Sequence, residues 1–152
     1  MPNWCQNFVS ISHDDPALIK TAIEAISNPL NDRGLFSAFM PCPEFEDDGW
    51  YMWRVENWGT KWDVTSEDVY PSDDGRLFTA HFVSAWSPPI AGYQGLEKLG
   101  FKVEASYHEP GMRYYGTYRD GKDDCREYGS YFDVPVEIVE LFGLEPEEEE
   151  GE

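Results

Sequence analysis

The chain has 152 residues, of which 41% are hydrophobic and 16% aromatic, so it is long and apolar enough for one domain with a packed core. Its 30 acidic and 11 basic residues give a net charge of −19, which disfavours direct binding to nucleic acid or to an anionic membrane surface. Three cysteines are not typical of a disulfide framework, and no apolar run is long enough to predict a transmembrane helix. We therefore expect a cytoplasmic protein with reduced thiols.

The first third of the chain predicts a strand, a helix and an irregular segment. Residues 4–12 alternate as in a strand, and Pro16 suits the first position of the helix that follows. That helix should end before Pro29. We expect residues 29–49 to be irregular, with a short extended piece that tucks under the fold. The apolar residues of this piece are Leu35, Phe36, Phe39 and Met40.

The central stretch from Trp50 to Asp63, WYMWRVENWGTKWD, holds four of the six tryptophans. Helical spacing predicts two turns of helix over residues 50–57, and Gly59 should end them. Alternation predicts that a strand begins at Trp62. A turn at residues 73–75 then leads into a strongly predicted strand over 76–86.

The second half predicts a helix after Pro89, three strands and a short closing helix. The expected strands cover residues 101–108, 112–118 and 123–131, and the last helix covers 134–142. We predict a single domain over residues 1–144 and a disordered acidic tail over 145–152. Without the tail's six acids the body still has 24 acidic against 11 basic residues, a net charge of −13.

This order predicts an α+β fold. We expect a ferredoxin-like split βαβ antiparallel sheet with helices on one face, extended by the C-terminal strands.

Three stretches together resemble a known family. They are Met1–Asn7 (MPNWCQN), Asn57–Asp63 (NWGTKWD) and Ala85–Pro89 (AWSPP). They look like the YubB-type ferredoxin-like domain proteins of phages, plasmids and bacterial genomes, over roughly residues 1–132. The resemblance implies a ferredoxin-like fold and an origin in a mobile element, but no catalytic mechanism. The acidic body and the glutamate tail are not part of the family's pattern.

The NWGTKWD motif allows two interpretations. As a ligand site, its aromatic faces and polar groups suit base stacking or sugar contacts. As structure, it is a tight turn in which the tryptophans pack and the polar residues bond to backbone. The ligand-binding candidates are Asn57, Trp58, Lys61, Trp62 and Asp63.

Catalytic signatures are absent from the sequence. No metal-ligand spacing, phosphate-binding loop or hydrolase elbow occurs. Cys5 would need a nearby histidine or a helix N-terminus to act as a nucleophile, and a cysteine in a strand is more often a small buried side chain. We predict a protein that is not an enzyme and that holds no cofactor and no metal.

Tyrosines and acids gather on the last three predicted strands. Alternation predicts aromatics on both sheet faces, one of them exposed and ringed by acids, which suits either strand propensity or a protein interface. The interface candidates are Tyr115, Tyr118, Asp120, Asp123, Asp124, Glu127 and Tyr128.

These features lead to one expected function and an alternative. We expect an acidic protein of a phage or other mobile element that binds a basic, nucleic-acid-handling host protein or nucleoprotein complex. An anti-CRISPR or anti-restriction role would fit, since carboxylates can occupy sites that normally hold phosphates. The alternative is a ferredoxin-like module that binds RNA, a nucleotide or a small ligand through residues 58–63. An enzyme with an unfamiliar site is a third class.

Overall fold

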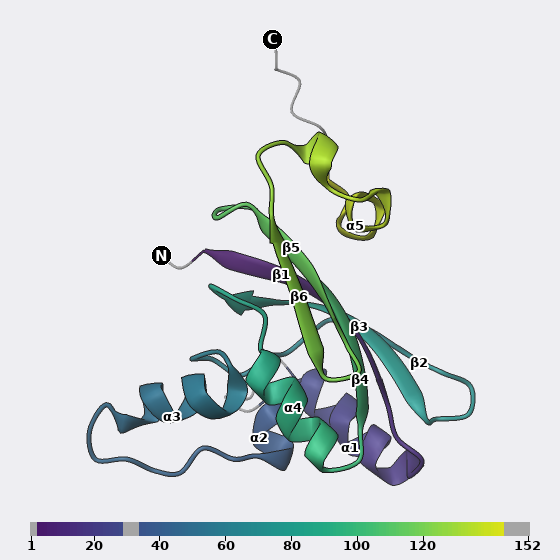
Figure 1. Cartoon of the computed structure of the whole chain (residues 1–152). Coiled ribbons are helices and arrows are strands. Elements are labelled where there is room, and N and C mark those ends of the chain that lie inside the picture. Colours follow the sequence, from purple (N-terminus) through teal and green to yellow (C-terminus); the bar gives the residue numbers. More distant parts are fainter. Residues whose placement is uncertain (1–2, 29–33, 145–152) are drawn as a thin grey trace.

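The computed structural model describes residues 3–28 and 34–144, and its elements follow the predicted order (Figure 1). The predicted tail at 145–152 lies outside the described residues. The elements are β1 (Trp4–Ser12), α1 (Pro16–Ile26), α2 (Leu35–Phe39), α3 (Gly49–Trp58), β2 (Asp68–Pro71), β3 (Leu77–Ala85), α4 (Ile90–Lys98), β4 (Lys102–Glu109), β5 (Tyr114–Arg119), β6 (Lys122–Glu127), a 3₁₀ turn η1 (Tyr131–Asp133) and α5 (Val136–Phe142).

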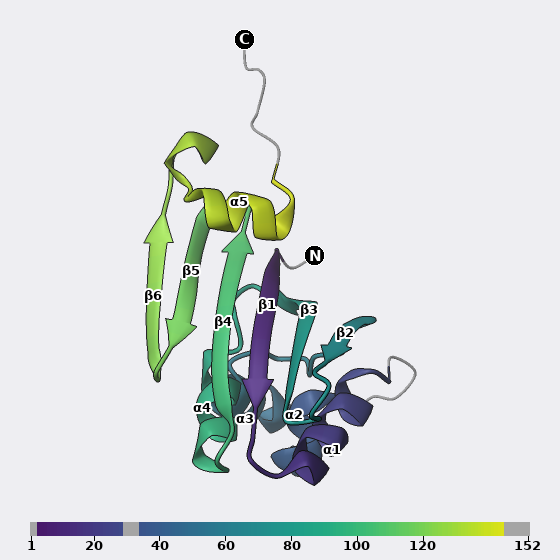
Figure 2. The ribbon, with the colours of Figure 1, turned by 90° about the vertical axis from the view of Figure 1, so that its right-hand side faces the viewer.

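The strands form one six-stranded antiparallel sheet in the order β2-β3-β1-β4-β5-β6 (Figure 2). The first strand of the chain lies in the middle, where Phe8 is opposite His81 on β3 and Ser106 on β4. Every second residue of β1, starting from Cys5, is buried, as the predicted alternation requires. The molecule is therefore a mixed α/β structure built on an antiparallel sheet.

Helices α1 to α4 lie on one face of this sheet, which we call the helix side (Figures 1 and 2). Aliphatic residues of α1 and α4 pack there against Val9 and Phe78, and Trp58 completes the core from the end of α3. Helix α5 lies on the opposite, outer face, where the ring of Phe142 contacts the rings of His81 and His108. The expectation that all helices cover one face is therefore wrong for α5.

A second cluster of apolar side chains fixes α5 and η1 to the outer face. Its buried members are Tyr128, Val134 and Ile138. Among the described residues, no helix has both the length and the apolar composition needed to cross a membrane.

Two local predictions around Asp63 are wrong for one physical reason. The carboxylate of Asp63 accepts hydrogen bonds from the backbone amides of Gly34, Phe36 and Ser37, at 2.8 Å each. It thereby satisfies the amides at the start of α2, so the expected extended piece is a short helix. The segment that begins at Trp62 is held against α2 by these bonds, and the strand starts later, at Asp68.

Candidate functional site

The three motifs that carry the family resemblance meet at one end of the sheet. The backbone amide of Trp86 donates to the carbonyl of Asn3 at 2.7 Å, which joins the first motif to the third. The hydroxyl of Ser87 donates to the carbonyl of Gly59 at 3.4 Å, which joins the third motif to the second. We call this region, formed by residues 3–7, 57–63 and 85–89, the motif junction.

Three indoles of the motif junction are exposed. Trp4, Trp62 and Trp86 are 42%, 41% and 49% exposed. The rings of Trp4 and Trp62 stack with their centroids 5.7 Å apart, and the ammonium of Lys61 lies 4.2 Å from the Trp62 centroid. Trp86 has a φ of 72°, a left-handed conformation that is unusual for a bulky residue. The hydroxyl of Tyr114 donates to the Trp86 carbonyl at 2.6 Å and helps to hold this conformation.

Trp58, in contrast, is part of the core. It is 1% exposed, and its indole N–H donates to the carbonyl of Met40 at 3.0 Å. The guanidinium of Arg54 lies 5.0 Å from the ring centroids of both Trp50 and Trp58. The rings of helix α3 therefore enclose its own cation.

The motif thus divides between surface and structure. Trp62 is exposed and Lys61 is half-buried, whereas Trp58 packs in the core and Asp63 binds backbone amides. Asn57 is exposed, but its side-chain amide donates to the carbonyl of Trp53 on the same helix, at 2.8 Å. Sequence reasoning did not select Trp4 and Trp86 as ligand candidates, although both belong to the resembling motifs.

Buried polar groups also lie in and next to the motif junction. The side-chain amide of Asn7 donates to the hydroxyl of Ser84 at 2.9 Å, and that hydroxyl donates to the Ser87 carbonyl at 2.6 Å. Burial, together with the charge of Glu109, raises the pKa of Cys5 to about 12. The thiol is protonated at neutral pH, so this environment does not activate it as a nucleophile.

Two of the tyrosines named as interface candidates are buried. Tyr118 lies in the main core and donates its hydroxyl to the carboxylate of Glu97. The hydroxyl of Tyr128 bonds to Nε2 of His108 at 2.6 Å, on the outer face of the sheet. Tyr115 is half-buried beside Tyr128. The expectation of an exposed aromatic surface on these strands is therefore wrong, because most of these rings and hydroxyls have partners inside the fold.

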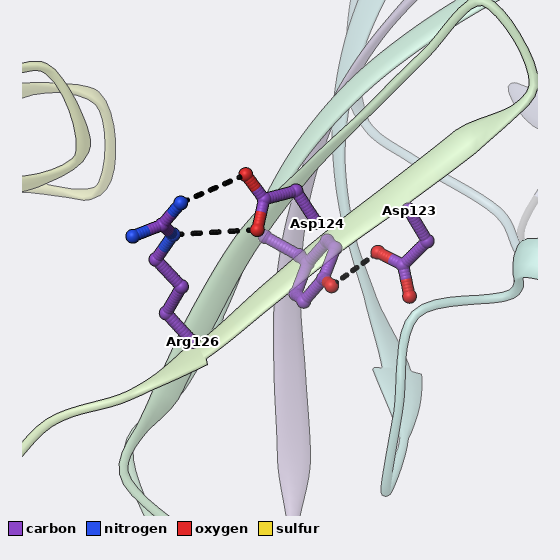
Figure 3. A network of polar contacts seen from close by, with 4 residues as sticks. Asp123, Asp124 and Arg126 are labelled. Atoms are coloured by element: carbon purple, nitrogen blue, oxygen red, sulfur yellow. Dashed lines mark hydrogen bonds and ion pairs between the residues drawn. The ribbon is translucent and has the colours of Figure 1, made fainter.

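The acids of the last strands are divided between the two sheet faces. All six side chains of β6 are exposed, and Figure 3 shows Asp124 and Arg126 on one side of the strand and Asp123 on the other. The carboxylate of Asp124 pairs with Arg126, at 3.3 Å between Oδ1 and Nε. The register places Arg119 opposite Lys122 on the same outer face as Arg126.

Three cations therefore accompany the four acids of residues 119–127, so this region has little excess of negative charge. Arg119 and Arg126 line a cavity of about 350 Å³ between the outer face and α5. Asp123 and Glu127, which alternate with these residues, lie on the helix side of the sheet.

A second cavity, of about 340 Å³, lies on the helix side next to the motif junction. We call it the Tyr107 pocket. It is lined by backbone and side-chain atoms from the end of α3, the start of α4 and strands β4 to β6. Its lining residues include Pro88, Tyr107, Tyr114, Asp123 and Cys125.

A strongly acidic surface surrounds helix α3. Residues 44–57 contain five acids and one base, and that base is Arg54, which the α3 rings enclose. All five carboxylates are exposed, and four apolar side chains among them are 39% to 58% exposed. We call this surface the α3 face. Its acids are Glu44, Glu46, Asp47, Asp48 and Glu56, and its apolar residues are Phe45, Tyr51, Met52 and Val55.

The sequence predicts an irregular segment over residues 29–49 and places the functional surface on the last strands. The acids and apolar residues of α3 are visible in the sequence. Their exposure is not, because it depends on which side of the helix packs against the core. Figure 1 shows α3 at the margin of the helix layer, away from the sheet.

Comparisons with known proteins define the fold relationship alone. No family model matches the sequence, and no curated protein shows significant similarity to it. Among solved structures, the chain is similar to the protein api92 from Yersinia pseudotuberculosis, which matches the family model DUF1281. The TM-score is 0.50 at 10% sequence identity, and the match covers 86% of this chain and 99% of api92.

Proposed function

We propose that this protein is an acidic, non-enzymatic binding protein that acts by contact with a basic partner protein. The α3 face carries this proposal. It combines four exposed apolar side chains with five exposed carboxylates, and its single guanidinium is enclosed by tryptophan rings.

The composition of the α3 face suits recognition of a protein. Aromatic residues and methionine are enriched in the centre of protein interfaces, and a charged rim selects the partner's charge. The exposed apolar side chains of Tyr51, Met52 and Val55 would supply the centre, and the carboxylates around them would supply the rim. A partner with a basic surface around an apolar groove is the complement, and its attraction should weaken with salt.

The partner class proposed is a basic, nucleic-acid-handling host protein or complex, such as a CRISPR or restriction complex. This protein would then have an anti-CRISPR or anti-restriction role. The arginines and lysines of such a complex normally hold phosphates, and carboxylates can take the place of these anions. An origin in a phage or other mobile element and a cytoplasmic location belong to the same proposal. They rest on the three YubB-type motifs and on the sparse cysteines.

A ferredoxin-like arrangement is part of the proposal as well. The order β2-β3-β1-β4, with α1 following β1 and α4 following β3, is the one that a split βαβ unit would give. Strands β5 and β6 would then extend the sheet.

A capture experiment with matched variants tests the proposed function. The tagged protein is incubated with host lysate at low and at high salt, and bound proteins are identified by mass spectrometry. Neutralising Glu44, Glu46 and Glu56 to glutamine should reduce recovery of a basic partner several-fold. Neutralising three exposed acids around β2, in the variant E67Q/D68N/D73N, changes the net charge equally and should leave recovery unchanged. Equal losses in both variants, or recovery that does not depend on salt, would contradict the proposal.

The exposed indoles of the motif junction favour a second candidate function, a nucleotide- or small-ligand-binding module. The stacked Trp4 and Trp62 rings and the nearby Lys61 ammonium could contact a base and a phosphate. A tryptophan fluorescence titration with nucleotides and short RNA tests this candidate. Quenching at micromolar ligand that is lost in Trp62→Ala would support it, and no quenching up to millimolar ligand would exclude it.

A further inference from the structure

We infer that the Tyr107 pocket accepts an arginine side chain of the basic partner, with the guanidinium bound to Asp123 beside the half-buried ring of Tyr114. The inference rests on the proposed function, because it assigns a recognition element to the same partner. Both the pocket and the α3 face lie on the helix side of the sheet, and Gly59, which ends α3, lines the pocket.

The walls of the pocket are aromatic and apolar. The half-buried ring of Tyr114 lies edge to face with the fully buried ring of Tyr107, with their centroids 6.0 Å apart, and Pro88 and Ile90 also line the pocket. A guanidinium is planar and weakly hydrated, so it gains more from such rings than an ammonium does. The same chain already uses this chemistry internally, where Arg54 lies between Trp50 and Trp58.

Asp123 supplies the anion. One of its carboxylate oxygens, Oδ1, accepts a hydrogen bond from the hydroxyl of Tyr107. Figure 3 shows the second oxygen directed away from that bond, and within the described part of the chain it accepts no hydrogen bond. Since β6 is an exposed edge strand, this oxygen can be reached from solvent. A free carboxylate oxygen beside an accessible aromatic ring is a good acceptor for a guanidinium N–H.

The charge of the pocket also favours a cation. None of its lining residues is a lysine, arginine or histidine. Burial raises the pKa of Tyr107, and the neighbouring Asp123 raises it further. Burial likewise raises the pKa of Cys125, and the charges of Asp123 and Glu127 add to this effect. The phenol and the thiol are therefore neutral at physiological pH, and the carboxylate charge is not balanced within the pocket.

The cavity on the outer face makes a useful contrast. It is of similar size, but Arg119 and Arg126 line it together with Asp124 and Glu137, so its cations balance its acids. A guanidinium should therefore select the Tyr107 pocket, and a contact at the outer cavity would indicate a different kind of site.

Titration with a small arginine probe tests the inference without the partner. N-acetyl-arginine methylamide is added to the full-length protein, and amide shifts are followed by ¹H–¹⁵N NMR. We expect saturable shifts at millimolar probe, centred on Tyr114, Asp123 and Cys125. N-acetyl-citrulline methylamide has nearly the same shape without the charge and should give no saturable shifts at these residues.

Two variants and one control isolate the role of Asp123. Asp123→Asn should weaken the probe roughly tenfold, as expected for loss of one charge-assisted hydrogen bond. Tyr107→Phe keeps the ring and releases the Oδ1 oxygen, so it should bind the probe at least as tightly as the wild type. Asp120→Asn removes an exposed acid of the adjacent turn, outside the pocket lining, and should change affinity less than twofold. Preserved amide dispersion in each variant shows that the fold is intact.

Equal shifts with the citrulline probe would overturn the inference, as would unchanged affinity in Asp123→Asn or shifts centred on Arg119 and Arg126. These outcomes are distinct from failure of the proposed function. Arginine binding without recovery of a basic partner would leave the pocket assigned and the proposed function contradicted. Recovery that depends on the α3 face, without arginine binding, would do the reverse.

Discussion

Asp63 illustrates how the fold uses a charged residue for its own backbone. Its carboxylate accepts three amides of the segment that starts α2 and the amide of Val64, each at 2.8 Å. A half-buried carboxylate with this many donors links two segments that are about thirty residues apart in the sequence. Polar residues of the NWGTKWD motif thus make structural hydrogen bonds, which explain much of the motif's composition.

Replacement of Asp63 should therefore destabilise the protein. We expect Asp63→Ala to lower the free energy of unfolding by about 2–4 kcal/mol, because several amides lose a charged acceptor and water replaces it only in part. Urea unfolding followed by tryptophan fluorescence measures the change. Asp68→Ala, at an exposed position of the β2 edge, is the matched control and should cost less than about 0.5 kcal/mol. Similar losses at the two positions would contradict the role assigned to Asp63.

Gly59 combines a conformational and a steric requirement. Its φ of 78° is left-handed, and a Cβ atom there would lie 2.9 Å from the backbone nitrogen of Ile90 at the start of α4. Gly121 has a nearly equal φ of 77° with nothing within 4 Å of the same atom. Gly121→Ala should therefore cost about 1 kcal/mol for conformation alone.

Gly59→Ala should cost about 1–3 kcal/mol more than Gly121→Ala, because α3 and α4 must move apart. Thermal unfolding of the two variants provides the comparison. Equal shifts in Tm would mean that the contact between α3 and α4 relaxes without cost.

At the scale of elements, the outer face of the sheet is held to α5 and η1 by rings around His108. The His108 ring contacts Tyr128, Tyr131 and Phe142, with centroids 5.7 to 6.3 Å away. Nε2 bonds to the Tyr128 hydroxyl at 2.6 Å, and Nδ1 lies 3.3 Å from Oε1 of Gln6. One neutral histidine and its aromatic neighbours therefore attach α5 and η1 to the outer face of the sheet.

The attachment should be sensitive to pH. Burial lowers the pKa of His108 below its ordinary value of 6.5, so the unfolded chain binds the proton more readily than the folded one. The stability that depends on neutral His108 is fully present above the pKa of this histidine in the unfolded chain. It is lost as the pH falls through and below about 6.5. We expect the free energy of unfolding to decrease between about pH 7.5 and 5.5.

His108→Gln removes the imidazole that takes up the proton. The free energy of unfolding should therefore decrease less over the same pH range. Denaturant unfolding at several pH values measures this pH dependence. His13→Gln provides a control at a less buried histidine, which directly follows β1. An unchanged slope in His108→Gln would show that other groups cause the pH dependence.

At the scale of the whole molecule, charge is unevenly distributed. The α3 face is strongly acidic, the outer face of β5 and β6 holds three cations, and the Tyr107 pocket has only a carboxylate. The net charge of −19 nevertheless makes self-repulsion a property of the entire chain.

Salt should therefore stabilise the free protein while it weakens binding to a basic partner. We expect Tm to rise by a few degrees from low ionic strength to about 0.3 M NaCl, since screening reduces repulsion among carboxylates. A variant that ends at Leu144 lacks six acids and should show a smaller rise. Circular dichroism melts give the comparison, and a Tm that falls with NaCl would contradict it.

Much of the element order followed from local pattern. The alternation of β1, the Pro16 helix start and the Gly59 stop were all confirmed, because each depends on side chains and dihedral angles within a few residues. The start of β2 and the form of α2 were wrong, because Asp63 binds a segment distant in sequence. The position of α5 on the outer face likewise depends on rings from β3 and β4.

The candidate site shows the same division. The sequence alone shows which residues are aromatic or acidic and contains three distinctive motifs. The packing of the folded chain buries Trp58, leaves Trp4, Trp62 and Trp86 exposed, and brings cations next to the acids of the last strands on one face. The physical reason is that burial and net local charge are sums over neighbours in space. Strand pairing and helix packing choose those neighbours from distant parts of the chain.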